Sequence, residues 1–309
     1  MAYVRDKARV LAPGTAERYG RNLVIFLRWL KQREGGKRKL YPDILTRNLL
    51  AEFYEHLAIK GRHGRPRQDS TRRKIVEVVQ LAWEWAYNDD ELAEGVPSPR
   101  SIEMRRKEGA PTVAPTWTEM DAVIHAFPEG SWQRQLAIVL RFTGLRVQQA
   151  LGLRWDDVDM DEATLTIRGE LGKSRQERRG RIVPLSPHLM SILAGWGKRE
   201  GYLIPTNRQA RRERLARPRD LGRAWDRAGV RKGAWEGRPH HAFRKGFVSE
   251  LRRAGADPDV VEVLVGHSLG LRGVYTDPDA LPMREAVALI PPIQESRVVL
   301  RLEPKEVKK

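Results

Sequence analysis

The sequence predicts a mostly α-helical protein with a small antiparallel β-sheet, organised in two domains. Apolar residues recur every three to four positions through much of the chain, which is the periodicity of amphipathic helices. Two short segments, residues 163–168 and 181–185, have the composition and alternation of strands. Residues 97–115 contain four prolines and no apolar periodicity, which indicates a linker between the domains.

The first domain, residues 1–96, is predicted to be helical. Its apolar stripes run from Thr15, from Leu49 and from Ile75. We expect the hydroxyl of Thr15 to cap the first helix. Residues 60–67 form a basic loop that is either solvated or in contact with phosphate groups.

The second domain, residues 116–292, is predicted to combine helices with a β-hairpin. The helix that contains residues 136–140 is expected to end at Thr143-Gly144. Ser186 and Asp257 each precede a proline, the pattern of an N-cap followed by the first helical turn. Residues 293–309 form a tail, in which residues 297–302 are expected to be a short strand that pairs within its own fold or with another subunit.

Charge and composition narrow the class of partner. The chain has 57 Lys and Arg against 40 Asp and Glu, a formal charge of +17. Such an excess favours nucleic acid over the alternatives of a soluble basic protein or a binder of acidic membranes. The absence of cysteine excludes disulfides, thiol catalysis and Cys-rich zinc sites. With no apolar run near the roughly 20 residues of a membrane span and no signal peptide, we expect a cytoplasmic, nucleoid-associated protein without a membrane partner.

Separated segments carry residues suited to chemistry on a phosphodiester. Arg146 follows Thr143-Gly144-Leu145, and His241 and Arg244 form a His-x-x-Arg pattern. His267 follows a glycine and precedes Tyr275 by eight residues, and Lys173 lies in the turn between the two predicted strands. Each pattern is weak on its own.

Attack on a phosphodiester adds negative charge to its non-bridging oxygens, which two planar guanidiniums can bind. Arg146 and Arg244 fit this role without a metal or another cofactor. A phenol both attacks and leaves, so Tyr275 is the candidate nucleophile. The departing sugar oxygen needs a general acid, for which Lys173 is the candidate, with Arg175, Arg178, Arg179 and Lys198 as alternatives.

In this order, the motifs resemble the tyrosine recombinase (phage integrase) family over about residues 140–290. The pattern Thr15, Tyr19, Leu23, Phe26, Trp29 is similar to the family's helical core-binding (SAM-like) domain. The resemblance implies an α/β catalytic domain and site-specific recombination through a 3′-phosphotyrosine. It implies that His241 assists proton transfer or holds the phosphate, and that His267 donates a hydrogen bond to the scissile phosphate.

The resemblance also implies partners. We expect the two domains to clamp double-stranded DNA at short inverted-repeat sites, and the subunits to assemble on it as a homotetramer, with accessory directionality factors as further partners.

Three positions depart from the family pattern. Lys245 stands where a second His is usual, Gln149 stands where an acidic residue would orient Arg146, and the gap from His267 to Tyr275 is one residue short.

Ten basic residues are candidates for contact with DNA, although several could equally belong to solvated surfaces. They are Arg62, Arg65, Arg67, Arg72, Arg73, Lys74, Arg175, Arg211, Arg212 and Lys245. The acidic run of residues 156–162 is expected to be a structural turn, because it lacks the glycine of a calcium loop.

Three other functions remain open. A type IB topoisomerase would share the chemistry and relax supercoils as a monomer. A DNA-binding protein of the same fold would lack catalysis, although the complete set of catalytic residues argues against it. A metal-dependent nuclease or transposase would lose its activity in EDTA.

Overall fold

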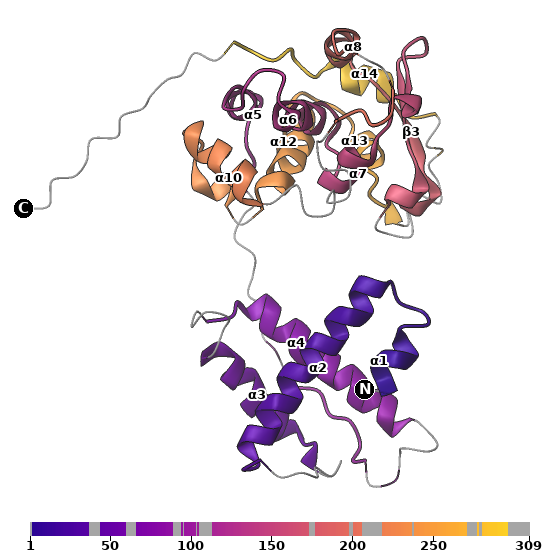
Figure 1. Cartoon of the computed structure of the whole chain (residues 1–309). Coiled ribbons are helices and arrows are strands. Elements are labelled where there is room, and N and C mark those ends of the chain that lie inside the picture. Colours follow the sequence, from indigo (N-terminus) through magenta and orange to yellow (C-terminus); the bar gives the residue numbers. More distant parts are fainter. Residues whose placement is uncertain are drawn as a thin grey trace, which may run out of the picture. The chain divides into compact units, whose positions relative to one another are not determined.

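A computed structural model describes residues 2–36, 44–59, 66–88, 94, 96–102, 104, 113–172, 177–197, 200–205, 218–236, 238–270, 277 and 280–295. The chain forms two compact units, Met1–Ala110 and Pro111–Lys309, each with its own hydrophobic core (Figure 1). The division between the units falls inside the segment proposed as a linker, residues 97–115.

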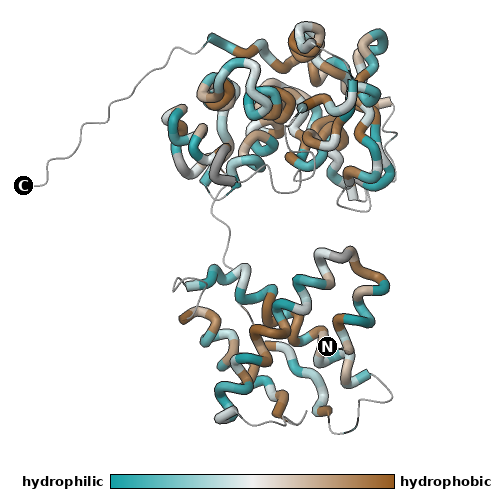
Figure 2. Tube along the Cα trace, in the orientation of Figure 1, coloured by the Kyte–Doolittle hydropathy of each residue, from teal (hydrophilic) through white to brown (hydrophobic). Residues whose placement is uncertain are grey.

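The first unit is helical, as the periodicity of its apolar residues predicts. In the described residues it contains α1 (Ala2–Lys7), α2 (Pro13–Arg33), α3 (Arg47–Ile59) and α4 (Asp69–Tyr87). Phe53 of α3 packs against Phe26 and Trp29 of α2, with 5.0 Å between ring centroids in both pairs. Figure 2 shows hydrophobic (brown) positions recurring along these helices between hydrophilic (teal) ones. Aromatic packing therefore joins α2 and α3 in the core.

The predicted cap at Thr15 is wrong. Helix α2 begins at Pro13, and its N-cap residue is Ala12, which forms no side-chain cap. Proline favours the first turn because its ring presets φ and it has no N–H that needs an acceptor. The N-cap therefore lies three residues earlier than expected, and the backbone N–H of Thr15 donates to Ala12 O at 2.8 Å.

The second unit is built around α6 (Trp132–Thr143), which packs against α5 (Trp117–His125) and α12 (Pro239–Arg253). Every residue of α6 from Leu136 to Thr143 is buried, so this helix lies inside the unit. The other helices described in this unit are α7 (Val147–Gly152), α8 (Pro187–Ala194), α10 (Pro218–Arg227), α11 (Lys232–Trp235), α13 (Pro258–Val265) and α14 (Met283–Ala288).

A three-stranded antiparallel sheet lies beside these helices, in the order β1 (Val158–Asp159), β2 (Thr164–Ile167), β3 (Arg181–Pro184). Leu165 pairs with Val183, and both are buried, whereas Thr166 and Ile182 are paired and exposed. The predicted hairpin and the predicted mostly helical fold class are confirmed.

Local hydrogen bonds explain why several of these elements begin and end where the sequence predicts. Ser186 Oγ accepts from Leu189 N at 3.2 Å and caps α8, and Asp257 Oδ1 accepts from Asp259 N at 2.7 Å and caps α13. In the acidic run, Asp159 Oδ1 accepts from the backbone N–H of Glu162 at 2.8 Å, as expected of a structural turn.

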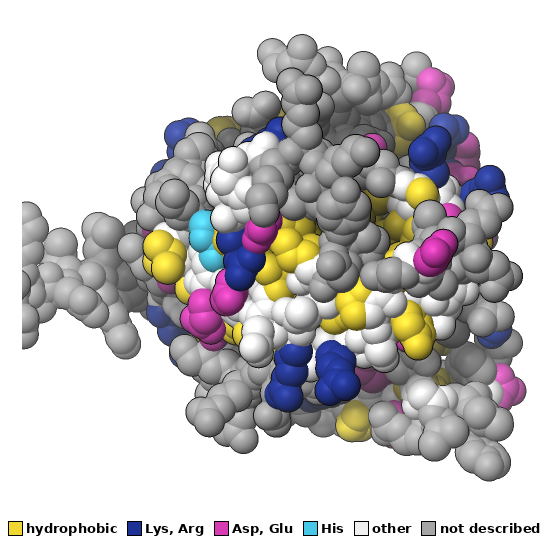
Figure 3. Space-filling model, turned by 90° about the horizontal axis from the view of Figure 1, so that it is seen from below, with side chains coloured by type: hydrophobic (Ala, Val, Ile, Leu, Met, Phe, Trp, Pro, Cys, Tyr) yellow, Lys and Arg dark blue, Asp and Glu magenta, His cyan; other side chains and the backbone are white. Residues whose placement is uncertain are grey.

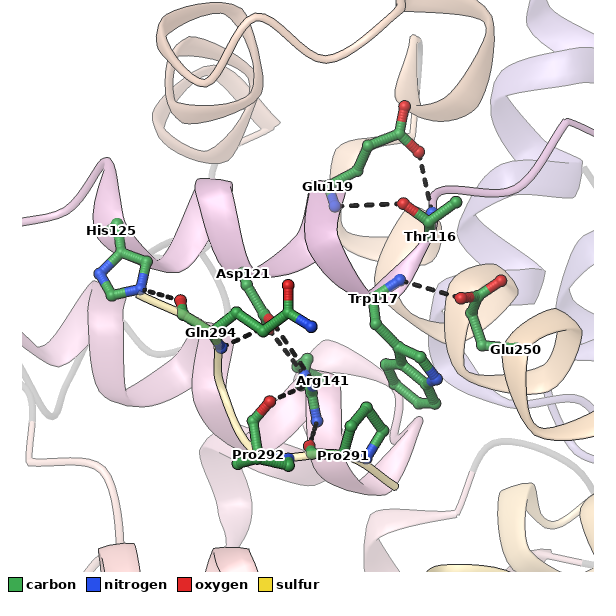
Figure 4. A network of polar contacts seen from close by, with 10 residues as sticks. All are labelled: Thr116, Trp117, Glu119, Asp121, His125, Arg141, Glu250, Pro291, Pro292 and Gln294. Atoms are coloured by element: carbon green, nitrogen blue, oxygen red, sulfur yellow. Dashed lines mark hydrogen bonds and ion pairs between the residues drawn. The ribbon is translucent and has the colours of Figure 1, made fainter. Parts of the chain in front are cut away.

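A buried ion pair holds the chain after α14 against α5 and α6 (Figure 4). The fully buried Arg141 donates from Nε to Asp121 Oδ1 at 2.9 Å and from Nη1 to Pro291 O at 2.7 Å. Asp121 Oδ2 also accepts from Gln294 N at 3.2 Å. Segment 291–294 is thereby fixed to the unit, whereas the strand expected at residues 297–302 lies outside the described residues.

Within the part of the chain that the structure describes, no helix is both long and apolar enough to cross a membrane.

Replacement of Asp121 tests the importance of this ion pair. In Asp121→Asn, the guanidinium of Arg141 stays buried without a carboxylate, so the free energy of unfolding should fall by about 3–5 kcal/mol. Denaturant unfolding measures the loss. Glu129→Gln is the control, because Glu129 has an exposed side chain, 3.8 Å from Arg134, and should change stability by less than about 1 kcal/mol. Equal stabilities of Asp121→Asn and the wild type would contradict the importance given to this pair.

Candidate active site

The turn between α6 and α7 positions Arg146. Gly144 ends α6 with a left-handed φ of 60°, and a Cβ there would lie 2.5 Å from the ring of Phe247. Thr143 Oγ1 accepts from Leu145 N at 3.3 Å. The chain therefore turns sharply, and only a glycine fits at the bend. Arg146 then occupies the N-cap position of α7.

The side chain of Gln149 accepts a hydrogen bond from the backbone of Arg146. Gln149 is 1% exposed, and its Oε1 accepts from Arg146 N at 3.1 Å. A neutral amide in place of the usual acidic residue thus fixes the start of α7, and with it the point from which the Arg146 side chain leaves the backbone.

Arg244 of α12 links the His-x-x-Arg motif to the turn that precedes Arg146. It is 2% exposed, and its Nη1 donates to Gly144 O at 3.0 Å, so the turn that positions Arg146 also accepts from the second arginine. Its Nε and Nη2 are buried and have no hydrogen-bond partner among the described residues. The two arginines predicted from separate segments are therefore brought to one place.

Arg181, at the start of β3, is a third guanidinium at this place. Its Nε donates to Leu264 O at 3.2 Å, and its two Nη groups are buried without a partner in the described part of the chain. A Cβ on Gly266 would lie 2.5 Å from Arg181 Nη1, so the guanidinium packs directly against Gly266. Arg181 is not among the site residues predicted from the sequence. A signal existed, since Arg181 shares the inward face of the strand with the buried Val183.

Arg146, Arg181 and Arg244 form what we call the guanidinium cluster. Burial, followed by the charges of Arg146 and Arg181, lowers the pKa of Arg244 to about 9. Burial and the charge of Arg146 lower the pKa of Arg181 to about 10. Burial also lowers the pKa of Arg146. All three remain cationic at neutral pH, so the cluster is a site of concentrated positive charge suited to an anion.

His267 lies at the end of α13, where Glu262 holds it. Gly266 ends this helix with a φ of 76°, and His267 N donates to Glu262 O at 2.8 Å. His267 Nδ1 lies 2.5 Å from Glu262 Oε2, and Glu262 Oε1 accepts from Arg252 at 2.5 Å. Burial and then Arg244 lower the pKa of His267, whereas Glu262 raises it. Glu262 is a second residue of this site that is not among those predicted from the sequence.

His241 lies on α12, three residues before Arg244. Burial, then the charges of Arg244 and Lys245, lower its pKa. It borders a cavity of about 400 Å³ next to the cluster. The cavity is lined by Leu145, Arg146, Val147, Gln148, Gln149, Leu171, Gly172, His240, His241 and Arg244. Arg146, His241 and Arg244, predicted from the sequence as site residues, thus share one cavity.

Several predicted residues lie outside the described residues. These are Lys173, Tyr275, Arg62, Arg65, Arg175, Arg211 and Arg212. In the part of the chain that the structure does describe, no group of three or more His, Asp or Glu side chains could hold a metal ion.

Arg72 is a correction among the predicted DNA contacts. It is 9% exposed, its Nη1 donates to Asp69 Oδ1 at 3.0 Å and its guanidinium stacks 3.9 Å from the Tyr54 ring centroid. It therefore stabilises the helical unit. Of the other described candidates for DNA contact, Lys74 is exposed, and Arg67, Arg73 and Lys245 are partly exposed.

Basic side chains do not form one uninterrupted patch on the face drawn in Figure 3. Among the described side chains, dark blue Lys and Arg lie next to magenta Asp and Glu and beside apolar residues. Ion pairs between α2 and α3, such as Arg33 Nε to Glu52 Oε2 at 2.8 Å, have this mixed character. Among the described side chains, net charge alone therefore does not define a basic surface on this face.

Comparison with known proteins shows the family of the chain. The sequence model of the phage integrase family matches residues 117–278, more than half of the chain. The chain belongs to the phage integrase family.

Relatives in this family are named tyrosine recombinases. XerC of Xanthomonas axonopodis pv. citri is 24% identical over 294 residues, which cover 90% of this chain and 90% of that protein. XerA of Thermococcus kodakarensis is 26% identical over 76% of this chain and 78% of that protein. The match to XerA of Pyrococcus furiosus, 28% identical over 56% of this chain, spans only 59% of that relative's length.

Solved structures show the same fold. A lambda integrase dimer bound to a COC′ core site has a TM-score of 0.64 at 16% identity, covering 90% of this chain and 94% of that one. The Tn1549 transposon integrase in complex with transposon right end DNA has a TM-score of 0.63 at 16% identity, covering 89% and 91%.

Substitution of Gly144 tests the turn that positions the cluster. Gly144→Ala forces a side chain into a left-handed backbone and into the ring of Phe247. Gly255→Ala is the matched control, since Gly255 has a φ of 90° but nothing within 4 Å of an added Cβ. In both variants, backbone strain should lower the free energy of unfolding. In Gly144→Ala, overpacking should lower it by about 1–3 kcal/mol more. Equal losses in denaturant unfolding would show that the turn is not tightly packed.

Proposed function

We propose that the chain is a site-specific recombinase that cleaves and rejoins DNA through a 3′-phosphotyrosine at Tyr275, without metal or ATP. The observation that carries this proposal is the convergence of Arg146 and Arg244, which are far apart in the sequence, through the carbonyl of Gly144. Arg244 is buried, cationic and has donors to spare, which is what a phosphodiester requires of its binding site.

The proposed reaction is a transesterification in each direction. The phenol oxygen of Tyr275 attacks the scissile phosphorus, the bond from phosphorus to the 5′ oxygen breaks, and a free 5′ hydroxyl leaves. Arg146 and Arg244 bind the non-bridging oxygens, on which negative charge grows in the transition state. Attack by a 5′ hydroxyl of another strand reverses the step and releases the phenol. The energy of the bond is conserved in the tyrosine ester, so no ATP is needed.

His241 and Lys173 are proposed to move the protons. Burial and the neighbouring charge of Arg244 lower the pKa of His241, so its ring is neutral at pH 7 and can accept the phenol proton. Lys173 gives a proton to the departing sugar oxygen. Lys245, partly exposed on α12, adds positive charge beside His241.

Double-stranded DNA with short inverted repeats is the proposed partner, bound by a homotetramer. Support comes from the solved relatives, among which lambda integrase is seen as a dimer on a core site and as a tetramer on a Holliday junction. The proposed contacts with DNA are Arg62, Arg65, Arg67, Arg73, Lys74, Arg175, Arg211, Arg212 and Lys245. Accessory directionality factors are proposed as further partners. The names of the relatives favour recombination over a topoisomerase, which would relax supercoils as a monomer.

Tyr275→Phe tests the nucleophile. The variant keeps the ring and loses the attacking oxygen, so it should bind DNA like the wild type and form no covalent adduct. A randomised duplex library with internal nicks supplies the substrate, because a nick lets the cleaved end diffuse away and traps the adduct. Complexes that survive denaturation in detergent are counted and sequenced, with EDTA present throughout.

Tyr202→Phe is the matched control and should form the adduct as the wild type does, since Tyr202 belongs to none of the motifs. An adduct formed by Tyr275→Phe would assign the nucleophile to another residue. Loss of all adduct in EDTA would favour a metal-dependent enzyme.

A further inference from the structure

Glu262 is attached to His267 at two points. Its backbone carbonyl accepts from His267 N at 2.8 Å, and its carboxylate Oε2 lies 2.5 Å from His267 Nδ1. Five residues separate the donor and acceptor, a spacing that the left-handed turn at Gly266 makes possible. The helix end therefore fixes both the backbone and the ring of His267.

The hydrogen bond determines which ring nitrogen carries the proton. A carboxylate can only accept, so Nδ1 must donate to Oε2. In the neutral ring, Nε2 is then the unprotonated nitrogen, and in the imidazolium it is the nitrogen with a free donor. Glu262 thereby selects one tautomer of His267, as carboxylates do for other functional histidines.

The charges around His267 oppose one another. Arg244 of α12 and Arg146 at the start of α7 both disfavour the imidazolium, and Glu262 of α13 favours it. Arg181 of β3 packs against the preceding Gly266, and Arg252 of α12 pairs with the other oxygen of Glu262. Glu262 is thus the carboxylate that offsets the guanidinium cluster at this ring.

We propose that Glu262 is a positioning residue for His267: it keeps a proton on Nδ1, so that Nε2 is the atom that takes up a proton and donates it in a hydrogen bond to the DNA phosphate. The identity of this anion rests on the proposed function, whereas the tautomer does not. When the phosphodiester arrives, the ring lies between two anions. Both anions favour the imidazolium. Nε2 therefore takes up a proton from solvent and donates a hydrogen bond to a non-bridging oxygen.

Nitrogen NMR of the full chain labelled at histidine measures the tautomer and the titration of His267 without DNA. Signals that disappear in His267→Asn identify the ring. In the wild type, Nδ1 should stay protonated across the titration and only Nε2 should change. In Glu262→Gln, an acceptor oxygen remains but the negative charge is lost, so the pKa of His267 should fall by about 1 unit or less. In Glu262→Leu, the preference for the Nδ1 proton should disappear.

Arg252→Gln separates positioning from packing. It removes the ion pair between α12 and α13 and leaves the contact of Glu262 with His267, so the His267 signals should stay as in the wild type. If Glu262 were merely structural, the His267 signals in Glu262→Gln would match those in Arg252→Gln. That result, or a wild-type ring protonated on Nε2, would overturn the proposal.

The DNA cleavage assay then tests the consequence for the reaction. Because the imidazolium is the proposed donor and Glu262→Gln lowers its pKa, the fall in cleavage rate with rising pH should begin at a lower pH in this variant. An unchanged pH profile in a variant whose NMR titration has shifted would overturn the role of His267 at the phosphate. Failure of the phosphotyrosine proposal would appear separately, as an adduct in Tyr275→Phe.

Discussion

Burial of one positive charge beside another costs free energy. In the guanidinium cluster, this protein buries positive charges close together. Arg181 and Arg244 each donate to one backbone carbonyl, and no described carboxylate is hydrogen-bonded to either of them. Burial beside like charge lowers the pKa of both arginines, and at Arg244 the charge of Glu262 offsets only part of this effect. Perturbed buried charges of this kind are typical of functional sites, and we propose that an anion completes this one. The rest of the second unit supplies the rigid core that holds the charges in place.

Two left-handed glycines give this core its geometry. Gly144 bends the chain so that Arg146 begins α7 and the Gly144 carbonyl reaches Arg244. Gly266 bends the chain after α13, which leaves room for the guanidinium of Arg181 and brings His267 back to Glu262. Two of the sequence motifs therefore have a physical basis, since at Gly144 and at Gly266 a helix end in the left-handed conformation is followed by a functional polar side chain.

Local patterns in the sequence predicted most of what depends on neighbouring residues. The hairpin, the caps at Ser186 and Asp257 and the helix end at Gly144 follow from periodicity and turn chemistry. Features that depend on distant segments were harder to predict. Arg181 was missed because its role arises only where β3 meets the end of α13, and Arg72 was assigned to DNA because charge alone does not reveal that α3 and α4 enclose it. Thr15 failed as a cap because Pro13 competes for the helix start more effectively.

The central claim, that an oxyanion completes the guanidinium cluster, can be tested without knowledge of the DNA site. Thermal unfolding of the wild type and of Arg244→Met is compared in sulfate and in chloride at equal ionic strength. General salting effects act on both proteins alike, whereas binding at the cluster stabilises only the protein that binds. The account predicts a rise in unfolding temperature with sulfate that is clearly larger in the wild type than in Arg244→Met. An equal rise in the two proteins would contradict it.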